Sequence, residues 1–302
     1  MKLKDFFSDE RLQSGTRGLS FELFPPKNEE LLPNLMNTVE ELQRFSPDFF
    51  TCTYGAGGST RDRTLGVLGA LKTQHNLRIA SHLTCVGSTV EQLRSYLDEA
   101  TAIGVDYIVA LRGDPPKGET EFKQTEGGLR YANDLVSMLR REYPALGILV
   151  AGYPEVHQEA PSAEVDLENL KRKVDAGADA IVTQLFYNNE DFYRFRDRCE
   201  AIGIKIPVIP GILPVISLPS IQRIASMCKA SLPQDFVDAL SKSDQVDWQF
   251  EVGTDFAASQ VADLLKSGVP GIHFYVLNSS KATSKVLDAV GWSISSDIGS
   301  LS

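Results

Sequence analysis

The chain has 302 residues, of which 42% are hydrophobic and 23% are charged. These values are typical of a globular protein with enough apolar material for one large core. The formal net charge of −10 argues against a nucleic-acid-binding surface, because phosphate backbones are bound by clustered Lys and Arg. No apolar run approaches the ~18 residues of a membrane span, and the first residues lack the apolar core of a signal peptide, so we expect a cytoplasmic protein.

Short runs rich in Val, Ile, Leu and Phe alternate with amphipathic stretches of helical period along the chain. We predict strands at 19–24, 49–54, 79–84, 106–112, 147–152, 180–186, 206–211 and 271–276. A helix is predicted after each strand, at 28–45, 60–75, 89–103, 128–143, 163–176, 189–202, 218–228 and 281–290. Eight such units with near-continuous apolar strands predict an α/β fold, a (β/α)8 TIM barrel, as a single domain over residues 1–302. A doubly wound open sheet is the alternative.

Glycines near the predicted helix ends support this division, since a left-handed cap belongs there. They are Gly104, Gly177, Gly203 and Gly268. The stretch 229–270 is longer than one helix, so we expect extra helices between the seventh and eighth strands. The polar tail 293–302 is expected to fray.

Polar side chains follow most of the predicted strands. They are Glu22, Thr53, His82, Arg112, Asp114, Tyr153, His157, Gln184 and Tyr275. Because the C-terminal ends of the strands and the loops beyond them form the active site of a TIM barrel, we expect these side chains to converge on one site.

Glu22 lies inside the apolar run 21–26, where a carboxylate is costly unless it has a role. Its neighbours Phe21 and Phe24 should desolvate it and raise its pKa, as a general acid that works near neutrality requires. A structural acid paired with a buried arginine is the alternative. For Asp114, which precedes two prolines, the alternative is a local salt bridge or a turn.

The helix predicted after the fifth strand carries Asp166, Asn169, Arg172 and Lys173 broadly on one face. The basic run 171–173 could hold a diphosphate, or the face could be solvated and tied by internal ion pairs. The glycine-rich segment 53–60 matches neither a P-loop nor GxGxxG. Its glycines either allow a close approach to a ligand or make a tight turn.

The cysteines Cys52, Cys85, Cys199 and Cys228 form no CxxC pair, which favours reduced thiols over disulfides. His82 and Cys85, with Cys52 nearby, raise the question of a metal site. Residues an odd number apart on a strand point to opposite faces, so His82 and Cys85 should diverge and we predict no metal.

Seven motifs resemble, in order, those of the methylenetetrahydrofolate reductase family, over about residues 17–290. They are FELFPPK at 21–27, TYGA at 53–56, HLTC at 82–85, ALRGD at 110–114, YPEVH at 153–157, KRKVDAGA at 171–178 and IPGILP at 209–214. The length resembles that of the catalytic barrel of this family without a regulatory domain.

The resemblance implies an FAD-dependent enzyme that takes a hydride from NADH or NADPH and passes it to 5,10-methylenetetrahydrofolate in a ping-pong mechanism. The product, 5-methyltetrahydrofolate, would supply methyl groups for methionine synthesis. A homo-oligomer is expected, because such assemblies are common among enzymes of this kind.

The resemblance also implies roles for residues. Glu22 is the expected general acid that opens the imidazolidine ring, and Asp114 is the acid that tunes the flavin and stabilises the cationic folate. Gln184 and Tyr275 are expected substrate contacts. Expected FAD contacts are Thr53, His82, Arg112, Gly113, Asp114, Tyr131, Ala132, Tyr153, His157, Asp166, Asn169, Arg172 and Lys173. Some members place a phenylalanine from the helix after strand seven against the ligands, where this chain has Ile221 and Ile224.

Two other functions remain as alternatives. A proline-dehydrogenase-like barrel would also bind FAD, but it would have no role for the Glu22 strand. A non-enzymatic binding or scaffold barrel would hold no flavin.

Overall fold

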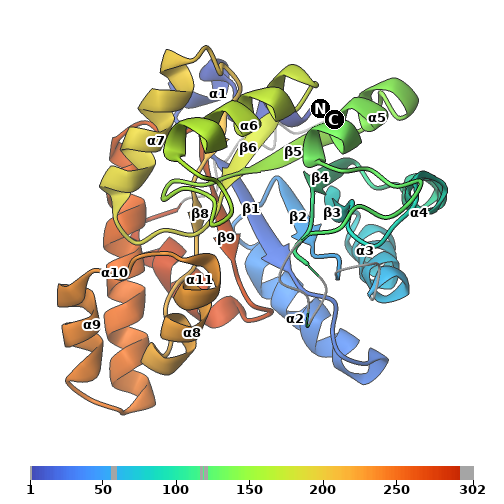
Figure 1. Ribbon diagram of the computed structural model, residues 1–302. Helices are drawn as coiled ribbons and strands as arrows, with labels where there is room; N and C mark the ends of the chain where they lie inside the picture. Colours follow the sequence, from blue (N-terminus) through green and yellow to red (C-terminus); the bar gives the residue numbers. More distant parts are fainter. Residues whose placement is uncertain (1, 56–59, 116–117, 119–121, 293–302) are drawn as a thin grey trace.

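Parallel strands form one continuous sheet in the computed structural model, which describes residues 2–55, 60–115, 118 and 122–292 (Figure 1). The expected fraying of residues 293–302 and the glycines at 57 and 58 lie outside the described residues. The strands are β1 (Gly18–Leu23), β2 (Phe49–Cys52), β3 (Ile79–Thr84), β4 (Tyr107–Leu111), β5 (Gly147–Gly152), β6 (Ala180–Thr183), β7 (Val208–Ile209), β8 (Gly211–Ile212) and β9 (Gly271–Tyr275).

The sheet closes into a barrel through β7 and β8, which are two halves of one segment. β7 pairs with β6, whereas β8 pairs with β9, and β9 pairs with β1. Pro210 separates the halves, because it has no N–H for a ladder hydrogen bond, and its carbonyl accepts from His273 N at 3.0 Å. The predicted eighth strand is therefore β9, and the TIM barrel is confirmed.

Helices cover the outside of the barrel. They are α2 (Leu32–Gln43), α3 (Arg61–His75), α4 (Val90–Ile103), α5 (Ala132–Glu142), α6 (Ala163–Asp175), α7 (Asn189–Ala201), α8 (Leu218–Cys228) and α11 (Ser280–Ala289). The extra helices between the last two strand segments, α9 (Gln234–Ser241) and α10 (Val246–Lys266), lie beside α8 as expected (Figure 1). None of the helices within the described ranges has the length and apolar character to cross a membrane.

Several predicted boundaries were wrong, and three of them have a clear local cause. The helix expected from residue 128 begins at Ala132, because a turn closed by Gly128 N and the Thr125 carbonyl comes first. The strand expected to reach 186 ends at Thr183, since the Gln184 side chain accepts from the Leu185 N–H and the chain leaves the sheet. The strand expected at 206–211 is the interrupted pair β7 and β8.

The barrel interior has an apolar layer and a polar layer, filled by alternate residues of the strands. The apolar layer includes Phe49, Ala80, Tyr107, Leu149, Ala180 and Ile209, near the N-terminal ends of the strands. The polar layer, near the C-terminal ends, contains Glu22, Thr51, His82, Thr84, His273 and Tyr275. The intervening strand residues, such as Phe21, Phe50 and Ile108, pack against the helices.

The N-terminal segment closes the apolar end of the barrel. A short 3-10 helix, η1 (Leu3–Phe7), packs against the apolar layer, and the Phe6 ring lies 6.3 Å from the ring of Phe49 and 6.2 Å from that of Tyr107. A second short 3-10 helix, η2 (Glu29–Leu31), precedes α2 at the other end. The polar end is not covered by η1, and we call it the open end of the barrel.

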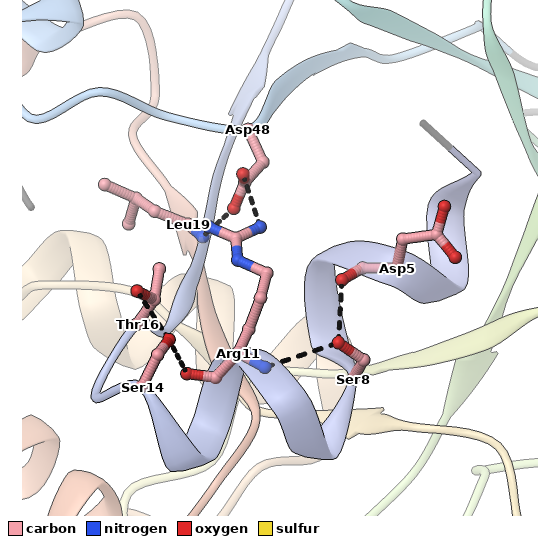
Figure 2. Close-up of polar contacts among 7 residues, drawn as sticks. All are labelled: Asp5, Ser8, Arg11, Ser14, Thr16, Leu19 and Asp48. Atoms are coloured by element: carbon pink, nitrogen blue, oxygen red, sulfur yellow. Dashed lines mark hydrogen bonds and ion pairs between the residues drawn. The ribbon is translucent and has the colours of Figure 1, made fainter. Parts of the chain in front are cut away.

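Asp48 holds the N-terminal segment to the sheet, as Figure 2 shows. Its carboxylate accepts from Arg11 Nη1 at 2.8 Å and from the Leu19 backbone N–H at 3.0 Å. Arg11 belongs to α1 (Asp9–Gln13), and Leu19 lies in β1, so one side chain ties a helix to the strand that carries Glu22. Burial raises the pKa of Asp48, and the hydrogen bonds from Arg11 and Leu19 offset part of this increase.

We expect Asp48→Ala to lower the free energy of unfolding by about 2–3 kcal/mol, because it leaves a buried N–H and a guanidinium without their acceptor. Urea denaturation would measure the change. Arg44→Ala is the matched control: it breaks an ion pair with Asp288 whose side chains are 53% and 55% exposed, and it should cost less than about 1 kcal/mol. Equal losses in the two variants would contradict the role of Asp48.

Candidate active site

Glu22 lies in the polar layer between two histidines. Its Oε2 atom is 3.3 Å from His82 Nε2 and 3.9 Å from His273 Nε2. The three side chains come from β1, β3 and β9, and their residues are 8%, 9% and 2% exposed. The predicted convergence of Glu22 and His82 is therefore present, and the acid pairs with histidines rather than with a buried arginine.

His273 is a member of this cluster that the sequence patterns did not reveal. Ser20 Oγ lies 2.8 Å from His273 Nδ1, and both residues are buried. Ser20 and His273 each stand two positions before a predicted site residue on the same strand, namely Glu22 and Tyr275. Because side chains two apart on a strand share a face, this spacing was the available signal.

The pKa of Glu22 is shifted in the direction opposite to that predicted. Burial alone would raise it, but the positive charge of His82 and hydrogen bonds from His273 and His82 lower it from 4.5 to about 2. The prediction considered the apolar neighbours along the chain and omitted the two imidazoles across the barrel. Glu22 is thus ionised at neutral pH in this arrangement.

Tyr275 links strands across the barrel closure. Its hydroxyl donates to the Thr183 carbonyl at 2.7 Å, and Thr183 Oγ1 accepts from Gly211 N at 3.0 Å. A Cβ on Gly211 would lie only 2.2 Å from the Thr183 carbonyl oxygen, so a larger residue would push the strands apart. Gln184 follows Thr183 directly, and its side-chain Oε1 accepts from Leu185 N.

Arg112, at the end of β4, forms a two-pronged ion pair with Glu159. Its Nη1 and Nη2 atoms lie 2.5 and 2.6 Å from the Glu159 carboxylate, and its guanidinium lies 5.0 Å from the Phe122 ring centroid. Gly113 follows with a φ of +88°, and a Cβ there would lie 2.5 Å from Val86 Cγ1, so glycine is required. Asp114 is exposed beside this pair.

The loop from β5 to α6 is tied to the start of α6. The Tyr153 and His157 rings meet edge to face at 4.6 Å, and the His157 N–H donates to Asp166 Oδ2 at 3.0 Å. Lys173 donates to the Ala151 carbonyl at 2.6 Å, and burial lowers its pKa to about 8. Four of the predicted cofactor contacts thus lie together beside the end of β5.

The remaining predicted contacts lie farther out. Arg172 and Asn169 are exposed and bond to each other at 2.8 Å, so part of this helix face carries an internal bond. Tyr131 is 46% exposed, with the Arg130 guanidinium over its ring, and Ala132 begins α5. The Thr53 carbonyl accepts from Thr64 Oγ1 in α3.

Cys85 and His82 point to opposite faces of β3 and its continuation, as parity predicted. The Cys85 thiol faces the carbonyls of Leu111 and Tyr131, away from the polar layer. In the part of the chain that the structure describes, no three His, Cys, Asp or Glu side chains are grouped to hold a metal ion.

An apolar groove lies beside the polar layer, at the end of β8. It is lined by Leu213, Pro214, Val215, Ile216, Ile221, Ile224 and Leu277, with the hydroxyls of Ser217 and Ser220 at its edge. Ile221 and Ile224 thus lie together where an aromatic residue is expected in some relatives. The site as a whole combines an acid–imidazole cluster, a rim of charged side chains of both signs from β4 to α6, and an apolar groove.

Comparison with known proteins assigns the chain to a family. Residues 8–291 match the family model described as methylenetetrahydrofolate reductase. The chain belongs to the methylenetetrahydrofolate reductase family. It is 39% identical to the 5,10-methylenetetrahydrofolate reductase of Escherichia coli over 280 residues, which is 92% of each chain. It is 38% identical to methylenetetrahydrofolate reductase (NADH) 1 of Arabidopsis thaliana over 290 residues, 92% of this chain but only 49% of the plant relative.

Solved structures of distant proteins share the barrel. A protein from Clostridium thermocellum that binds two copies of 5-methyl-5,6,7,8-tetrahydrofolic acid has a TM-score of 0.60 at 15% identity, with 93% of this chain and 96% of that one covered. A phosphonopyruvate hydrolase has a TM-score of 0.53 at 13% identity, with 96% and 85% covered. At these identities the likeness shows the fold alone, and it bears out the predicted TIM barrel.

The pKa of Glu22 makes a prediction about acid stability. Because this pKa is lowered on folding, the unfolded chain takes up a proton at Glu22 first as the pH falls from 4.5 to about 2. We therefore expect the parent to lose stability relative to Glu22→Gln across this window, by at most about 1.4 kcal/mol per pH unit. Urea denaturation of both proteins at several pH values would measure it. If burial dominated and raised the pKa of Glu22 instead, the parent would become more stable relative to Glu22→Gln as the pH falls.

Proposed function

We propose that this chain reduces 5,10-methylenetetrahydrofolate to 5-methyltetrahydrofolate, with electrons from NADH or NADPH and through a bound FAD. The observation that carries the proposal is the Glu22–His82–His273 cluster at the open end of the barrel, in a member of this family. The product would supply methyl groups for methionine synthesis. We expect the enzyme to work in the cytoplasm as a homo-oligomer.

The residues around β4, β5 and α6 suit a flavin dinucleotide. Arg112 and Lys173 supply cations beside the strand ends, and Arg172, the neighbour of Lys173 in the last turn of α6, is exposed. Charge-assisted hydrogen bonds from such groups bind phosphates. The Thr84 hydroxyl is buried and makes no hydrogen bond to the described residues, so it is available to a ligand. Bound FAD would accept a hydride from the nicotinamide and return it to the folate carbon. Thr53, His82, Gly113, Asp114, Tyr131, Ala132, Tyr153, His157, Asp166 and Asn169 would complete this site.

The acid–imidazole cluster would supply the proton for ring opening. In the folate, one carbon bridges two nitrogens, and breaking one C–N bond requires a proton on the leaving nitrogen while the other becomes an iminium. Glu22 Oε2 lies within 3.9 Å of both imidazole Nε2 atoms, so the carboxylate and the imidazoles are close enough to exchange a proton. Glu22 is thus the proposed general acid, with the proton stored beside it.

The other proposed residues would place and stabilise the folate. Asp114 contributes a negative charge near the cationic iminium, whose stabilisation follows from Coulomb attraction. Gln184 and Tyr275 lie at the ends of β6 and β9 and would contact the substrate rings. One site for both substrates in turn would give ping-pong kinetics.

Rapid mixing of the FAD-loaded enzyme would test the function. We expect NADH or NADPH to bleach the flavin, and 5,10-methylenetetrahydrofolate to restore its absorbance in a second, separate step. Bleaching by proline without a nicotinamide would favour a proline-dehydrogenase-like enzyme, and purification without any ability to bind flavin would favour a scaffold. Comparison of the two nicotinamides would also reveal the preferred donor.

Glu22→Gln should keep FAD and accept electrons from the nicotinamide at close to the parent rate. Its reoxidation by the folate should fall by about 10²–10⁴-fold, because only that step needs the proton. Stopped-flow measurement of both half-reactions would separate the effects. Equal losses in the two steps would count against Glu22 as the acid.

Arg172→Ala should weaken FAD binding by about tenfold, since it removes a charge-assisted phosphate contact. Quenching of flavin fluorescence during titration of the apoenzyme would give the dissociation constant. Arg196→Ala is the control, because Arg196 is a partly exposed arginine on α7 that pairs with its neighbour Asp197. The phosphate role of Arg172 is wrong if both variants bind FAD as the parent does.

A further inference from the structure

The side chain of Asn278 joins two loops at the open end of the barrel. Its Oδ1 atom accepts from the Phe24 backbone N–H at 2.8 Å, and its Nδ2 donates to the Phe24 carbonyl at 2.8 Å. Phe24 follows β1 directly, and Asn278 follows β9, the partner strand of β1. The amide therefore continues the pairing of β1 with β9 beyond the point where the two strands end.

The backbone at Asn278 is built to present this amide. Leu277 and Asn278 have φ angles of +48° and +58°, in the left-handed region that a leucine rarely enters. The Asn278 carbonyl also accepts from Thr38 Oγ1 of α2 at 3.3 Å. Such a conformation is retained only where the surroundings hold it in place, which directs attention to what it positions.

Phe24, the partner of Asn278, and Leu277, the residue before Asn278, both present large apolar side chains to solvent. Phe24 is 38% exposed and Leu277 is 42% exposed. Leu277 lines the apolar groove at the end of β8, and Phe24 stands two residues after Glu22. The two hydrogen bonds to Phe24 thus join the segment that carries Glu22 to the segment that lines the groove.

We propose that Asn278 is a positioning residue for the folate half-reaction, an inference that rests on the function proposed above. By locking the loops after β1 and β9, it holds Phe24 and Leu277 as an apolar rim beside the acid. An aromatic part of the substrate lies against this rim, and its leaving nitrogen then meets Glu22. The residue touches no reacting atom and acts through the two loops.

Asn278→Gly tests this role directly, because glycine adopts the left-handed backbone freely and only the amide is lost. We expect the folate half-reaction to slow by about 10- to 100-fold, with a higher apparent KM for the folate, since small misplacements near a reacting group are costly. Reduction by the nicotinamide should stay within about twofold of the parent. Asn278→Asp, which keeps the acceptor for Phe24 N–H and loses the donor, should fall between.

Asn76→Gly is the matched control. Asn76 is also a left-handed asparagine, with a φ of 48°, but it caps the C-terminus of α3 at the other end of the barrel. It should leave both half-reactions unchanged. Parent-like folate kinetics in Asn278→Gly would overturn the inference, as would an equal loss in both half-reactions together with a lower melting temperature. If the parent itself did not reduce the folate, the proposed function would fail first, and the variants would not be needed to show it.

Discussion

Closure of the parallel sheet is the constraint on which the rest of this structure depends. The segment 208–212 meets β6 with its first half and β9 with its second, and the gap at Pro210 lets it change partner. Thr183, Gly211 and Tyr275 lock this point by backbone and hydroxyl bonds. Once the ring is closed, each strand must send alternate side chains inward, and residues from β1, β3 and β9 that are far apart in sequence are forced into one small volume.

That enforced proximity explains why Glu22 is ionised. Burial of a lone carboxylate would favour the neutral form, and the apolar residues on both sides of Glu22 in the sequence point to this outcome. Two imidazoles at 3.3 and 3.9 Å reverse the balance, because an opposite charge acts strongly where little water screens it. The carboxylate and the two imidazoles thus form one buried cluster. Ser20, bonded to His273 Nδ1, keeps the second imidazole turned toward the carboxylate.

The sequence was sufficient for the units of the fold and for the polar residues at the strand ends, since strand runs, helix caps and polar strand ends are local features. Gly104, Gly177, Gly203 and Gly268 do have positive φ, as predicted for helix ends. The local patterns failed where a partner comes from a distant strand. The split at Pro210 depends on two neighbouring strands, the Glu22–His273 contact spans the barrel closure, and the Arg112–Glu159 pair joins two loops. Spacing within one strand can put His273 on the same face as Tyr275, but it does not show which side chain of a distant strand or loop becomes the partner.

The two ends of the barrel divide stability from chemistry. At one end, η1 and the apolar layer pack aromatic rings against each other, and Asp48 ties this packing to β1. The hydroxyls of Thr51 and Thr84, at the other end, are buried without a hydrogen bond to the described residues, an arrangement that costs stability in the absence of a ligand. The protein can tolerate these buried polar groups because the packing of the apolar layer at the opposite end stabilises the fold. Rim contacts such as that of Asn278 with Phe24 then need only orient the loops, since the barrel below them is already rigid.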